Sequence, residues 1–577
     1  MAFLNKKEVA SILEDIGILL ELKGENPFKT RAYFNAARTI SGLTSDLTDL
    51  VENGEIGNIK GIGKALAEKI TTLVTTGKLE YYENLKSEFP PTIFELFGIP
   101  GLGPKKIKKL FDTLGITSLT ELEYACNENR LVDLEGFGAK TQDNILKGIG
   151  IRRKFSEKFH YPVARNAAEE MLKHINRSKG IKRAEIAGSL RRKREIIGDI
   201  DILVSAAKKD VDDVMKHFVR AADVEQVVAE GKTKSSIILK TGINVDMRVV
   251  ADKEFPFALH YFTGSKEHNV HMRRIANEHG YKLNEYGLFR ESDNTRISCS
   301  EEKDIFVKLG LEYIPPELRE DTGEIAAAEK GKLPNLIEET DVRGTFHCHT
   351  TYSDGANTLE EMLQAAESRK WEYLGIADHS QSAQYARGLS KSDIKRQRKE
   401  INSLNEKYES CRLLHGIESD ILADGSLDYD DKTLETFDFV VVSVHSRFKL
   451  TEAEMTKRII RAIKNKYTTI LGHPTGRLLL SRDGYNVDLV QVIDAAADYG
   501  KAIEINSHPY RLDLDWKMVK YAKEKGVTIS INPDAHNTDG LDDVRYGIGI
   551  ARKGWLEADN VLNTKSLTRV MHYLGIS

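Results

Sequence analysis

The chain has 577 residues, which is too long for one hydrophobic core, so we expect several domains. Its 40% hydrophobic and 30% charged residues are typical of a soluble globular protein. A net charge of only −4 argues against a wholly basic nucleic-acid binder, although it allows local basic patches.

The sequence shows no targeting signal that would direct the protein out of the cytoplasm. We find no signal peptide and no apolar stretch near about 20 residues, so we expect a cytoplasmic protein without a membrane partner. The four cysteines show no paired spacing, which argues against a disulfide framework. A monomer is the simplest expectation.

Three short repeats mark the amino-terminal part: IKGIGKALAEKI from Ile59, IPGLGPKKIKKL from Ile99 and LEGFGAKTQDNIL from Leu134. Each has an apolar residue, then Gly-x-Gly, then an amphipathic helix, and so allows a tight hairpin that exposes backbone N–H groups at a helix start. Such groups bind phosphate, often with a monovalent cation such as K⁺ or Na⁺ nearby. The repeats resemble helix-hairpin-helix motifs, which contact the DNA backbone without reading its sequence.

Of the three repeats, the second is predicted to attract DNA phosphates most strongly, because lysines directly follow its glycines. The third repeat carries fewer positive charges, and a purely structural role stays open for it. The candidate DNA-binding residues are Gly61, Gly63, Lys69, Gly101, Gly103, Lys105 and Lys106.

The middle of the chain reads AEIAGSLRRKREIIGDIDILV, in which a strand, a basic turn and a second strand follow one another. Period-two alternation places Asp199 and Asp201 on one face of the second strand, and Asp246 interrupts the apolar strand INVDMRVV. Three such carboxylates repel one another unless a cation lies between them. The pattern predicts a nucleotidyl-transfer site with two Mg²⁺ or Mn²⁺ ions, in which Ser189 and Arg192 hold a triphosphate.

The following segment, YFTGSKEHNVHMRRIANEHGYKLNEYGLF, closely resembles the nucleotide-binding subdomain of family X DNA polymerases, the group that contains DNA polymerase beta. Order and spacing agree with that family from about residue 20 to residue 318. The resemblance implies gapped or nicked duplex DNA and deoxynucleoside triphosphates as partners. It makes the three acids the catalytic, metal-binding triad, with Asp246 nearest the primer 3′-hydroxyl. The implied nucleotide and template contacts are Ser189, Arg192, Tyr261, Phe262, Gly264, Asn269 and Arg273.

The chain departs from the family in two places. Lys69 matches the lysine that forms a Schiff base in deoxyribose-phosphate lyase members, but Ala65 and Tyr81 replace its supporting lysines. Lyase activity therefore stays open, as does a simple phosphate contact by Lys69. The second departure is Asn244, which replaces a basic residue beside Asp246.

Six apolar runs in the last part of the chain stop at polar, ligand-type residues: VRGTFHCH, YLGIADH, LLHGIES, FVVVSVH, TILGH and TISINPDAH. Helical stretches lie between them, one of which is opened by Thr358 and Glu361 at the spacing of a capping box. Strands that alternate with helices and end in polar residues are typical of a β/α barrel with its chemistry on the carboxyl-terminal face. The candidate metal ligands are His347, His349, Asp354, His379, Glu418, His445, His473, Asp534 and His536.

Imidazoles mixed with carboxylates suit Zn²⁺, Mn²⁺ or Fe²⁺ better than Mg²⁺. Nine ligands exceed the needs of one ion, so we expect two or three ions, with Glu418 as a candidate bridge. His347 and His349 alternate along one strand, so their side chains are predicted to face the same side. Clustered divalent ions generate hydroxide near neutral pH and clamp phosphate oxygens, so metal-assisted phosphoester hydrolysis is predicted.

These elements resemble the polymerase and histidinol phosphatase (PHP) family, whose pattern is filled across residues 341–577. The resemblance implies a distorted TIM-like barrel of seven strands. It implies three ion sites: one with His347, His349, Glu418 and Asp534, one that shares Glu418 and adds His445 and His473, and one with Asp354, His379 and His536.

The whole chain thus resembles the bacterial and archaeal type of family X polymerase. The implied function is short-gap filling in base excision repair at the nucleoid, with a 3′–5′ exonuclease, and incision at abasic sites left open. The alternatives are a template-independent nucleotidyltransferase with a structural metal-binding barrel, and a small-molecule phosphatase. The expected segments are a helical domain with a helix-hairpin-helix motif (1–85), a second helix-hairpin-helix subdomain (86–155), an α+β palm (156–258), a nucleotide-binding subdomain (259–318), a linker (319–340) and the barrel (341–577).

Overall fold

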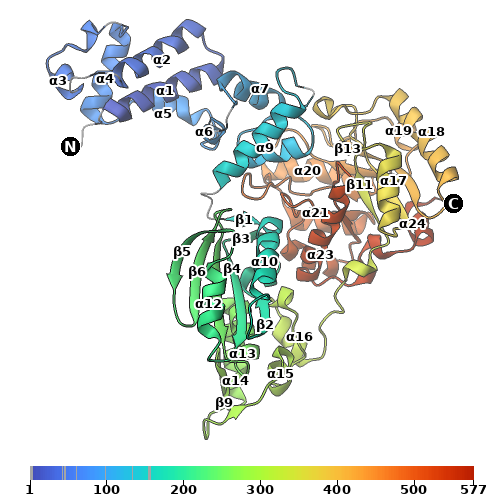
Figure 1. Ribbon diagram of the computed structural model, residues 1–577. Coiled ribbons are helices and arrows are strands. Elements are labelled where there is room, and N and C mark those ends of the chain that lie inside the picture. The colour runs from blue at the N-terminus through green and yellow to red at the C-terminus, as the bar shows by residue number, and fades with distance from the viewer. Residues whose placement is uncertain are drawn as a thin grey trace. The chain divides into compact units, whose positions relative to one another are not determined.

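The computed structural model describes residues 4, 6–41, 43, 47–59, 61–97, 99, 101–132, 134–153 and 158–576 (Figure 1). The chain divides into two compact units. The first comprises Met1–Cys126 and Leu131–Arg152, and the second comprises Asn127–Arg130 and Arg153–Ser577. None of the described helices is long and apolar enough to cross a membrane.

The described part of the first unit is helical and encloses a hydrophobic core of its own. Its helices are α1 (Lys6–Lys23), α2 (Pro27–Ser41), α3 (Leu47–Glu52), η1 (Ile56–Asn58), α4 (Lys64–Thr76), α5 (Glu80–Ser87), α6 (Ile93–Leu96), α7 (Pro104–Leu114), α8 (Leu119–Asn127) and α9 (Ala139–Arg153). Gly63 caps the start of α4 and Gly103 caps the start of α7. Gly61 and Gly101 have φ angles of 95° and 84°, which glycine adopts without strain. The predicted turn before each helix is confirmed.

A five-stranded sheet of order β2-β4-β7-β6-β5 forms the palm, in which β4 and β7 run parallel and the other pairs are antiparallel. Its elements are β1 (Phe159–His160), α10 (Tyr161–Ile175), β2 (Ile181–Ile186), α11 (Gly188–Arg191), β3 (Ile196–Ile197), β4 (Asp199–Ala206), α12 (Val211–Val219), β5 (Val224–Glu230), β6 (Lys234–Leu239) and β7 (Asn244–Val250). Ile200 and Ile202 of β4 join the core that contains α10 and α12. Because strand residues alternate between faces, Asp199 and Asp201 lie on the opposite face.

The next segment carries α13 (Phe255–Thr263), α14 (Lys266–Glu278), β8 (Tyr281–Asn284), β9 (Gly287–Arg290), β10 (Arg296–Ile297) and α15 (Glu302–Lys308). The predicted linker, residues 319–340, is packed and contains α16 (Glu324–Glu329), between η2 (Pro316–Leu318) and η3 (Glu339–Asp341). Two of its charged residues are buried and paired, since Arg319 bonds Glu302 at 2.5 Å and Glu324 bonds His268 at 2.8 Å. The sequence suggested a loose segment because charges of this kind usually face water.

Glu302 holds this region together, because its buried carboxylate accepts hydrogen bonds from Arg191 and Arg319. Burial alone would raise the pKa of Glu302, but the charge of Arg319 and the bonds from Arg191 hold that pKa far below its usual value of 4.5. The stabilisation is therefore complete above the pKa of the unfolded carboxyl group and is lost as the pH falls toward the folded pKa.

Glu302→Gln should therefore lower the free energy of unfolding at pH 7 by about 3–5 kcal/mol, since the buried guanidinium of Arg319 and the half-buried one of Arg191 lose their counter-charge. Urea denaturation followed by circular dichroism measures this difference, which should narrow as the pH falls below about 4. The exposed Glu329→Gln is the matched control. Equal stability of the Glu302 variant and the wild type would contradict the argument.

Seven parallel strands in chain order form the last part of the second unit: β11 (Gly344–Cys348), β12 (Tyr373–Ile376), β13 (Arg412–Asp420), β14 (Phe439–Ser443), β15 (Ile470–Leu471), β16 (Ala502–Asn506) and β17 (Ile529–Asn532). A parallel bridge between Cys348 and Ala535 brings the two ends of the sheet together, so it forms a nearly closed barrel. The predicted seven-stranded barrel is confirmed.

Helices cover the outside of this barrel (Figure 1). They are α17 (Leu359–Ser368), α18 (Lys391–Lys407), α19 (Asp431–Leu434), α20 (Glu452–Ile463), α21 (Leu489–Asp498), α22 (Trp516–Glu524), α23 (Val544–Lys553) and α24 (Leu567–Leu574), with the short helices η4 (Gln384–Ala386), η5 (Asp539–Asp543), η6 (Ala558–Asn560) and η7 (Leu562–Thr564). The predicted capping box of Thr358 and Glu361 opens α17. Phe346, Phe439 and Val570 of α24 pack in one apolar cluster that fills the barrel interior.

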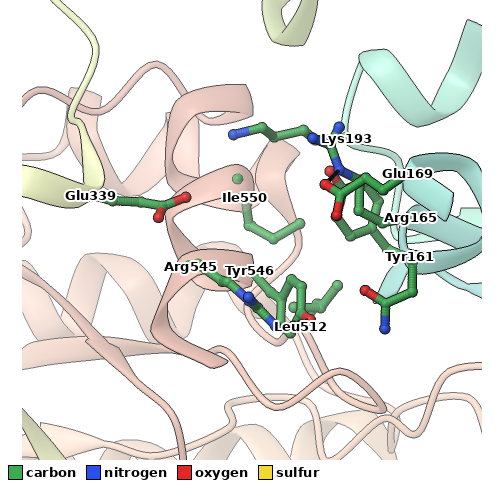
Figure 2. Close-up of a pocket in the computed structure, with 11 residues that line it drawn as sticks. Tyr161, Arg165, Glu169, Lys193, Glu339, Leu512, Arg545, Tyr546 and Ile550 are labelled. Atoms are coloured by element: carbon green, nitrogen blue, oxygen red, sulfur yellow. Dashed lines mark hydrogen bonds and ion pairs between the residues drawn. The ribbon is translucent and has the colours of Figure 1, made fainter. Parts of the chain in front are cut away.

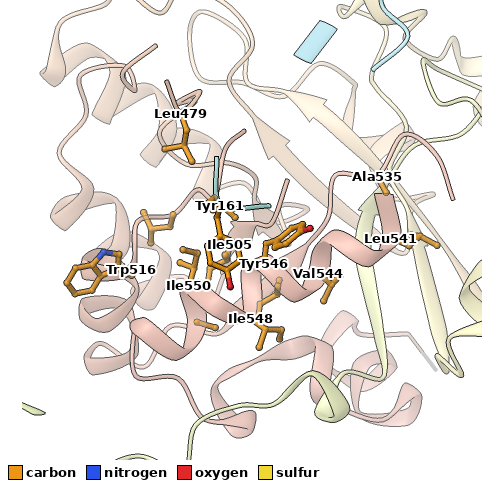
Figure 3. Packing of buried hydrophobic residues seen from close by; sticks show 14 of the residues in the cluster. Tyr161, Leu479, Ile505, Trp516, Ala535, Leu541, Val544, Tyr546, Ile548 and Ile550 are labelled. Carbon is orange, nitrogen blue, oxygen red and sulfur yellow. The ribbon is translucent and has the colours of Figure 1, made fainter. Parts of the chain in front are cut away.

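Palm and barrel meet at a cavity of about 260 Å³, lined by residues of both (Figure 2). Its basic residues already have acidic neighbours: Arg165 lies 2.5 Å from Glu169, and Lys193 lies 3.5 Å from Glu317. Tyr161 of α10 packs beside the α23 side chains of the barrel, and its ring centroid is 6.0 Å from that of Tyr546 (Figure 3). The two parts therefore share one hydrophobic core.

Candidate active sites

The three palm acids come together on two neighbouring parallel strands. Asp201 of β4 is in register with Asp246 of β7, and Asp199 lies two residues before Asp201 on the same face. Burial, together with the charges of Asp199 and Asp246, raises the pKa of Asp201 to about 6. A bound divalent cation would relieve this crowding of negative charge, so the three carboxylates fit such an ion.

Asp246 has a cationic neighbour that the sequence reasoning missed. Lys234 Nζ lies 2.6 Å from Asp246 Oδ2, and Ser236 Oγ donates a hydrogen bond of 2.5 Å to Oδ1. Both partners come from β6, which pairs with β7. Lys234 therefore supplies the positive charge that Asn244 does not. The alternation of KSSIIL contained the only sequence signal, and it did not indicate which strand β6 would join.

The backbone beside the acids leaves no room for a side chain at Gly188. Its φ angle is 63°, and a Cβ there would lie 2.2 Å from Asp201 Oδ2. The glycine thus lets the start of α11 approach the acids closely, and this places the adjacent Ser189 at the same edge.

The predicted nucleotide contacts gather around α11 and the end of α13. The Arg192 guanidinium contacts the Thr263 carbonyl and lies 3.1 Å from Glu320 Oε1, so a triphosphate would compete with Glu320 for it. A Cβ on Gly264 would lie 3.1 Å from Arg192 Nη1. The rings of Tyr261 and Phe262 meet edge to face with centroids 5.2 Å apart.

The two predicted contacts on α14 differ in their surroundings. Asn269 Nδ2 donates a 2.7 Å hydrogen bond to the Tyr261 carbonyl, so its amide is tied to α13. Arg273 is exposed one turn further along α14.

In the barrel, all nine predicted ligands come together at the carboxyl ends of the strands. Glu418 appears in two of the ligand groups, which suits a bridge between ions. Within each group the ligand atoms lie within 4.8 Å of one another: His349–Asp354–His379–His536, His347–His349–Asp534, His347–Glu418–His473 and His379–Glu418–His445.

Three of these ligands have left-handed backbone conformations, with φ angles of 56° at His347, 23° at His473 and 53° at Asp534. Such conformations cost about 1–3 kcal/mol each and are concentrated at functional sites. At His347 the strand register also shifts between Thr345 and Cys348, which indicates a bulge. His347 and His349 do reach the same cluster, with ring centroids 5.3 Å apart, but a bulge rather than plain alternation brings them there.

Several buried ligand atoms lack a hydrogen-bond partner among the described residues. They include His347 Nε2, His536 Nε2, Asp354 Oδ2, Glu418 Oε2 and both ring nitrogens of His379. Leaving a buried polar atom unpaired costs about 1–3 kcal/mol, and metal ions bound by these groups would relieve much of that cost. The mixed nitrogen and oxygen donors fit Mn²⁺, Zn²⁺ or Fe²⁺.

The electrostatics of the cluster differ from one imidazole to the next. Burial alone would lower the pKa of His379, but Asp354 and Glu418 raise it to about 10. Burial and the neighbouring His536 and His379 lower the pKa of His349 to about 3. The carboxylates are therefore placed to balance a cationic charge beside His379, and His349 is held neutral, as a metal ligand must be.

Two acids that orient the imidazoles were missed from the sequence. Glu504 of β16 accepts a 2.7 Å hydrogen bond from His347 Nδ1, and Asp420 accepts one of 2.6 Å from His445 Nδ1. Such partners fix the tautomer and raise the basicity of a metal-binding imidazole. An acid inside the apolar run AIEIN was the available signal for Glu504, and the two-residue spacing from Glu418 was the signal for Asp420.

In the first unit, the predicted DNA-binding lysines lie on the helices that follow the glycine turns. Lys105 is exposed on the first turn of α7, and Lys106 Nζ lies 5.5 Å from the centroid of the Phe137 ring. Lys69 lies on α4 with its Nζ 4.9 Å from the ring centroid of Tyr81. The exposed backbone at each helix start and these cations can bind phosphates.

Four family models match the chain. They are the helix-hairpin-helix domain at residues 5–79, the SAM-like helix-hairpin-helix tandem at 93–150, the DNA polymerase beta thumb at 258–320 and the PHP domain at 345–508.

Known proteins resemble either the whole chain or one of its parts. The "DNA polymerase/3′-5′ exonuclease PolX" of Bacillus subtilis is 39% identical over 573 residues, which cover 99% of both chains. DNA polymerase lambda of Arabidopsis thaliana is 27% identical over 50% of this chain and 58% of its own. A probable phosphatase of Thermoanaerobacter sp. is 30% identical over 40% of this chain and 92% of its own.

Proposed function

The chain belongs to the family X DNA polymerases that carry a PHP domain, and we propose that it fills short gaps during base excision repair. It is a DNA polymerase with a metal-dependent 3′–5′ exonuclease. The observation that supports both activities in one protein is the pair of acidic clusters, one on the palm sheet and one in the barrel. We expect it to act in the cytoplasm at the nucleoid, as a monomer.

In the palm, Asp199, Asp201 and Asp246 would hold Mg²⁺ or Mn²⁺, which neutralise charge on the phosphates and activate the primer hydroxyl. Lys234 and Ser236 fix the orientation of Asp246 through the two contacts described above. Arg192 would bind the triphosphate, Tyr261 and Phe262 would flank the sugar, and Asn269 would contact the base edge.

In the barrel, the ligand groups support two or three ions of Mn²⁺, Zn²⁺ or Fe²⁺, which together supply a hydroxide and clamp the phosphate that is cut. One ion would use His347, His349 and Asp534, and another would use Asp354, His379 and His536. Glu418 would bridge toward a third, held by His445 and His473. Incision at abasic sites would use the same groups.

We also propose that the first unit grips the phosphates of gapped or nicked duplex DNA, with K⁺ or Na⁺ at the glycine turns. Lys69 stays a candidate for deoxyribose-phosphate lyase chemistry.

For DNA binding, the double variant Lys105→Ala/Lys106→Ala should weaken binding to every sequence equally. It should also reduce the slope of log K against log salt by about 1.8, since each lost phosphate contact contributes about 0.9.

Fluorescence anisotropy at several salt concentrations measures that slope, with Lys432→Ala, an exposed lysine of the barrel, as the control. A slope that stays unchanged in the double variant would place the phosphate contacts elsewhere.

The test of the proposed function is a 5′-labelled primer that borders a one-nucleotide gap, incubated with Mn²⁺ with and without deoxynucleotides. Lengthening with nucleotides and shortening without them would support both activities. Addition of nucleotides without a template, with no shortening, would instead favour a terminal transferase with a structural barrel. Hydrolysis of sugar phosphates with no action on DNA would favour a small-molecule phosphatase.

A further inference from the structure

The barrel cluster contains a carboxylate that comes from outside the barrel. Residues Asn127–Arg130 belong to the second unit, although the residues on both sides of them belong to the first. Glu128 in this segment is only 2% exposed, and it forms a ligand-type group with Asp534 and His536. The segment lies more than two hundred positions before the first barrel strand, so neither strand patterning nor the barrel motifs could have indicated it.

Glu128 contacts His536 at Nδ1, whereas Asp354 contacts the other ring nitrogen. Glu128 Oε2 lies 2.6 Å from His536 Nδ1, while His536 Nε2 lies 3.3 Å from Asp354 Oδ1. His536 Nδ1 also lies 2.9 Å from the Asp534 carbonyl oxygen, so that carbonyl and Glu128 together favour the tautomer in which Nδ1 carries the proton and Nε2 carries a lone pair. His536 Nε2 has no hydrogen-bond partner among the described residues, so this lone pair is available to an ion.

A second side chain of the segment also reaches the cluster. Arg130 Nε lies 3.6 Å from Asp354 Oδ2, and its guanidinium carbon lies 5.3 Å from the centroid of the Tyr385 ring. Arg130 Nη2 lies 3.8 Å from Glu128 Oε2. Both ends of the Asp354–His536 pair are therefore contacted by residues of one short segment.

We propose that Glu128 is a positioning residue for the ion held by Asp354, His379 and His536, so that full metal loading of the barrel requires this carboxylate. This inference rests on the proposed metal-dependent hydrolysis. Glu128 acts through His536 by holding its ring and its tautomer, and the loss of such a partner typically costs about 10- to 100-fold in metal affinity.

The test compares Glu128→Ala, Glu128→Gln and Asn127→Ala in the full chain by Mn²⁺ titration and by metal content after dialysis. Asn127 is the matched control, because it lies in the same segment with an exposed side chain. Glu128→Ala should weaken one ion about 10- to 100-fold and lower exonuclease activity, with primer extension unchanged. Glu128→Gln keeps an oxygen acceptor for His536 Nδ1 and should restore part of the affinity.

Three outcomes separate the possibilities. Equal metal affinity and stoichiometry in Glu128→Ala and the wild type would overturn the inference. The proposed function would remain supported if the wild type shortens primers. A wild type that binds no metal in the barrel and shortens no primer would overturn the proposed function, and this inference with it. Metal loss in Asn127→Ala as large as in Glu128→Ala would also overturn it, because the effect would then belong to the segment rather than to the carboxylate.

Discussion

Alanine at both Asp199 and Asp201 should lower the rate of primer extension by about 1,000-fold or more, or about 4 kcal/mol of transition-state stabilisation. The two carboxylates share one face of β4, and Asp246 lies beside Asp201 on the neighbouring strand β7. Burial and the negative charges of Asp199 and Asp246 raise the pKa of Asp201 to about 6. Without them, Asp246 and its neighbour Lys234 cannot hold divalent ions between hydroxyl and triphosphate. Single-turnover extension of a one-nucleotide gap measures the loss.

The same double variant should shorten primers at the wild-type rate, because the barrel ligands belong to a separate cluster. Glu225→Ala, an exposed acid on β5 of the same sheet, is the control for a general effect of removing charge from the palm. Loss of both extension and shortening in the double variant would argue against two independent sites.

Most of the barrel ligands could be predicted from the sequence because nearly every one follows a short apolar run. Parallel strands that close into a barrel bring their carboxyl ends to one place, so residues as distant as His347 and His536 had to meet. The seven strands confirm that reasoning for the fold. What it left out is the bulge at His347, since a bulge depends on the pairing of two strands and has no pattern within one strand.

The residues that orient the ligands were harder to predict, because each is defined only by its partner. Glu504 and Lys234 are single charges in their strands, and they matter because Glu504 contacts His347 and Lys234 contacts Asp246. Sequence alternation shows which face a side chain takes but not which strand is next to it. Glu128 is the extreme case, because its segment shows no strand pattern at all.

For the region 319–340, the composition predicted a loose linker, whereas the structure has a helix and buried ion pairs there. Arg319 and Glu324 are fully buried because Glu302 and His268 neutralise them. Charge alone therefore does not separate a solvated linker from a packed connection when the counter-charges lie elsewhere in the chain.

Glu418→Gln should lower shortening of the primer by about 1,000-fold, because it removes the carboxylate shared by the groups His347–Glu418–His473 and His379–Glu418–His445. Glu418 Oε1 lies 3.2 Å from His347 Nε2 and 3.0 Å from His473 Nε2, and its Oε2 lies 2.8 Å from His379 Nδ1. A neutral amide at this point removes the negative charge that these three imidazoles share. Extension by the palm should stay at the wild-type rate.

The dependence on Mn²⁺ distinguishes what Glu418 contributes. If the glutamine variant only binds metal more weakly, a large excess of Mn²⁺ restores the rate; if Glu418 holds two ions at a fixed separation, the rate stays low when metal content is normal. Glu418 contacts imidazoles of three different strands, and no other described carboxylate lies in both of its ligand groups. We therefore expect that the rate stays low even when the metal content is normal. Glu435→Gln, an exposed acid of the barrel, is the control, and unchanged shortening by Glu418→Gln would exclude a role for the bridge in hydrolysis.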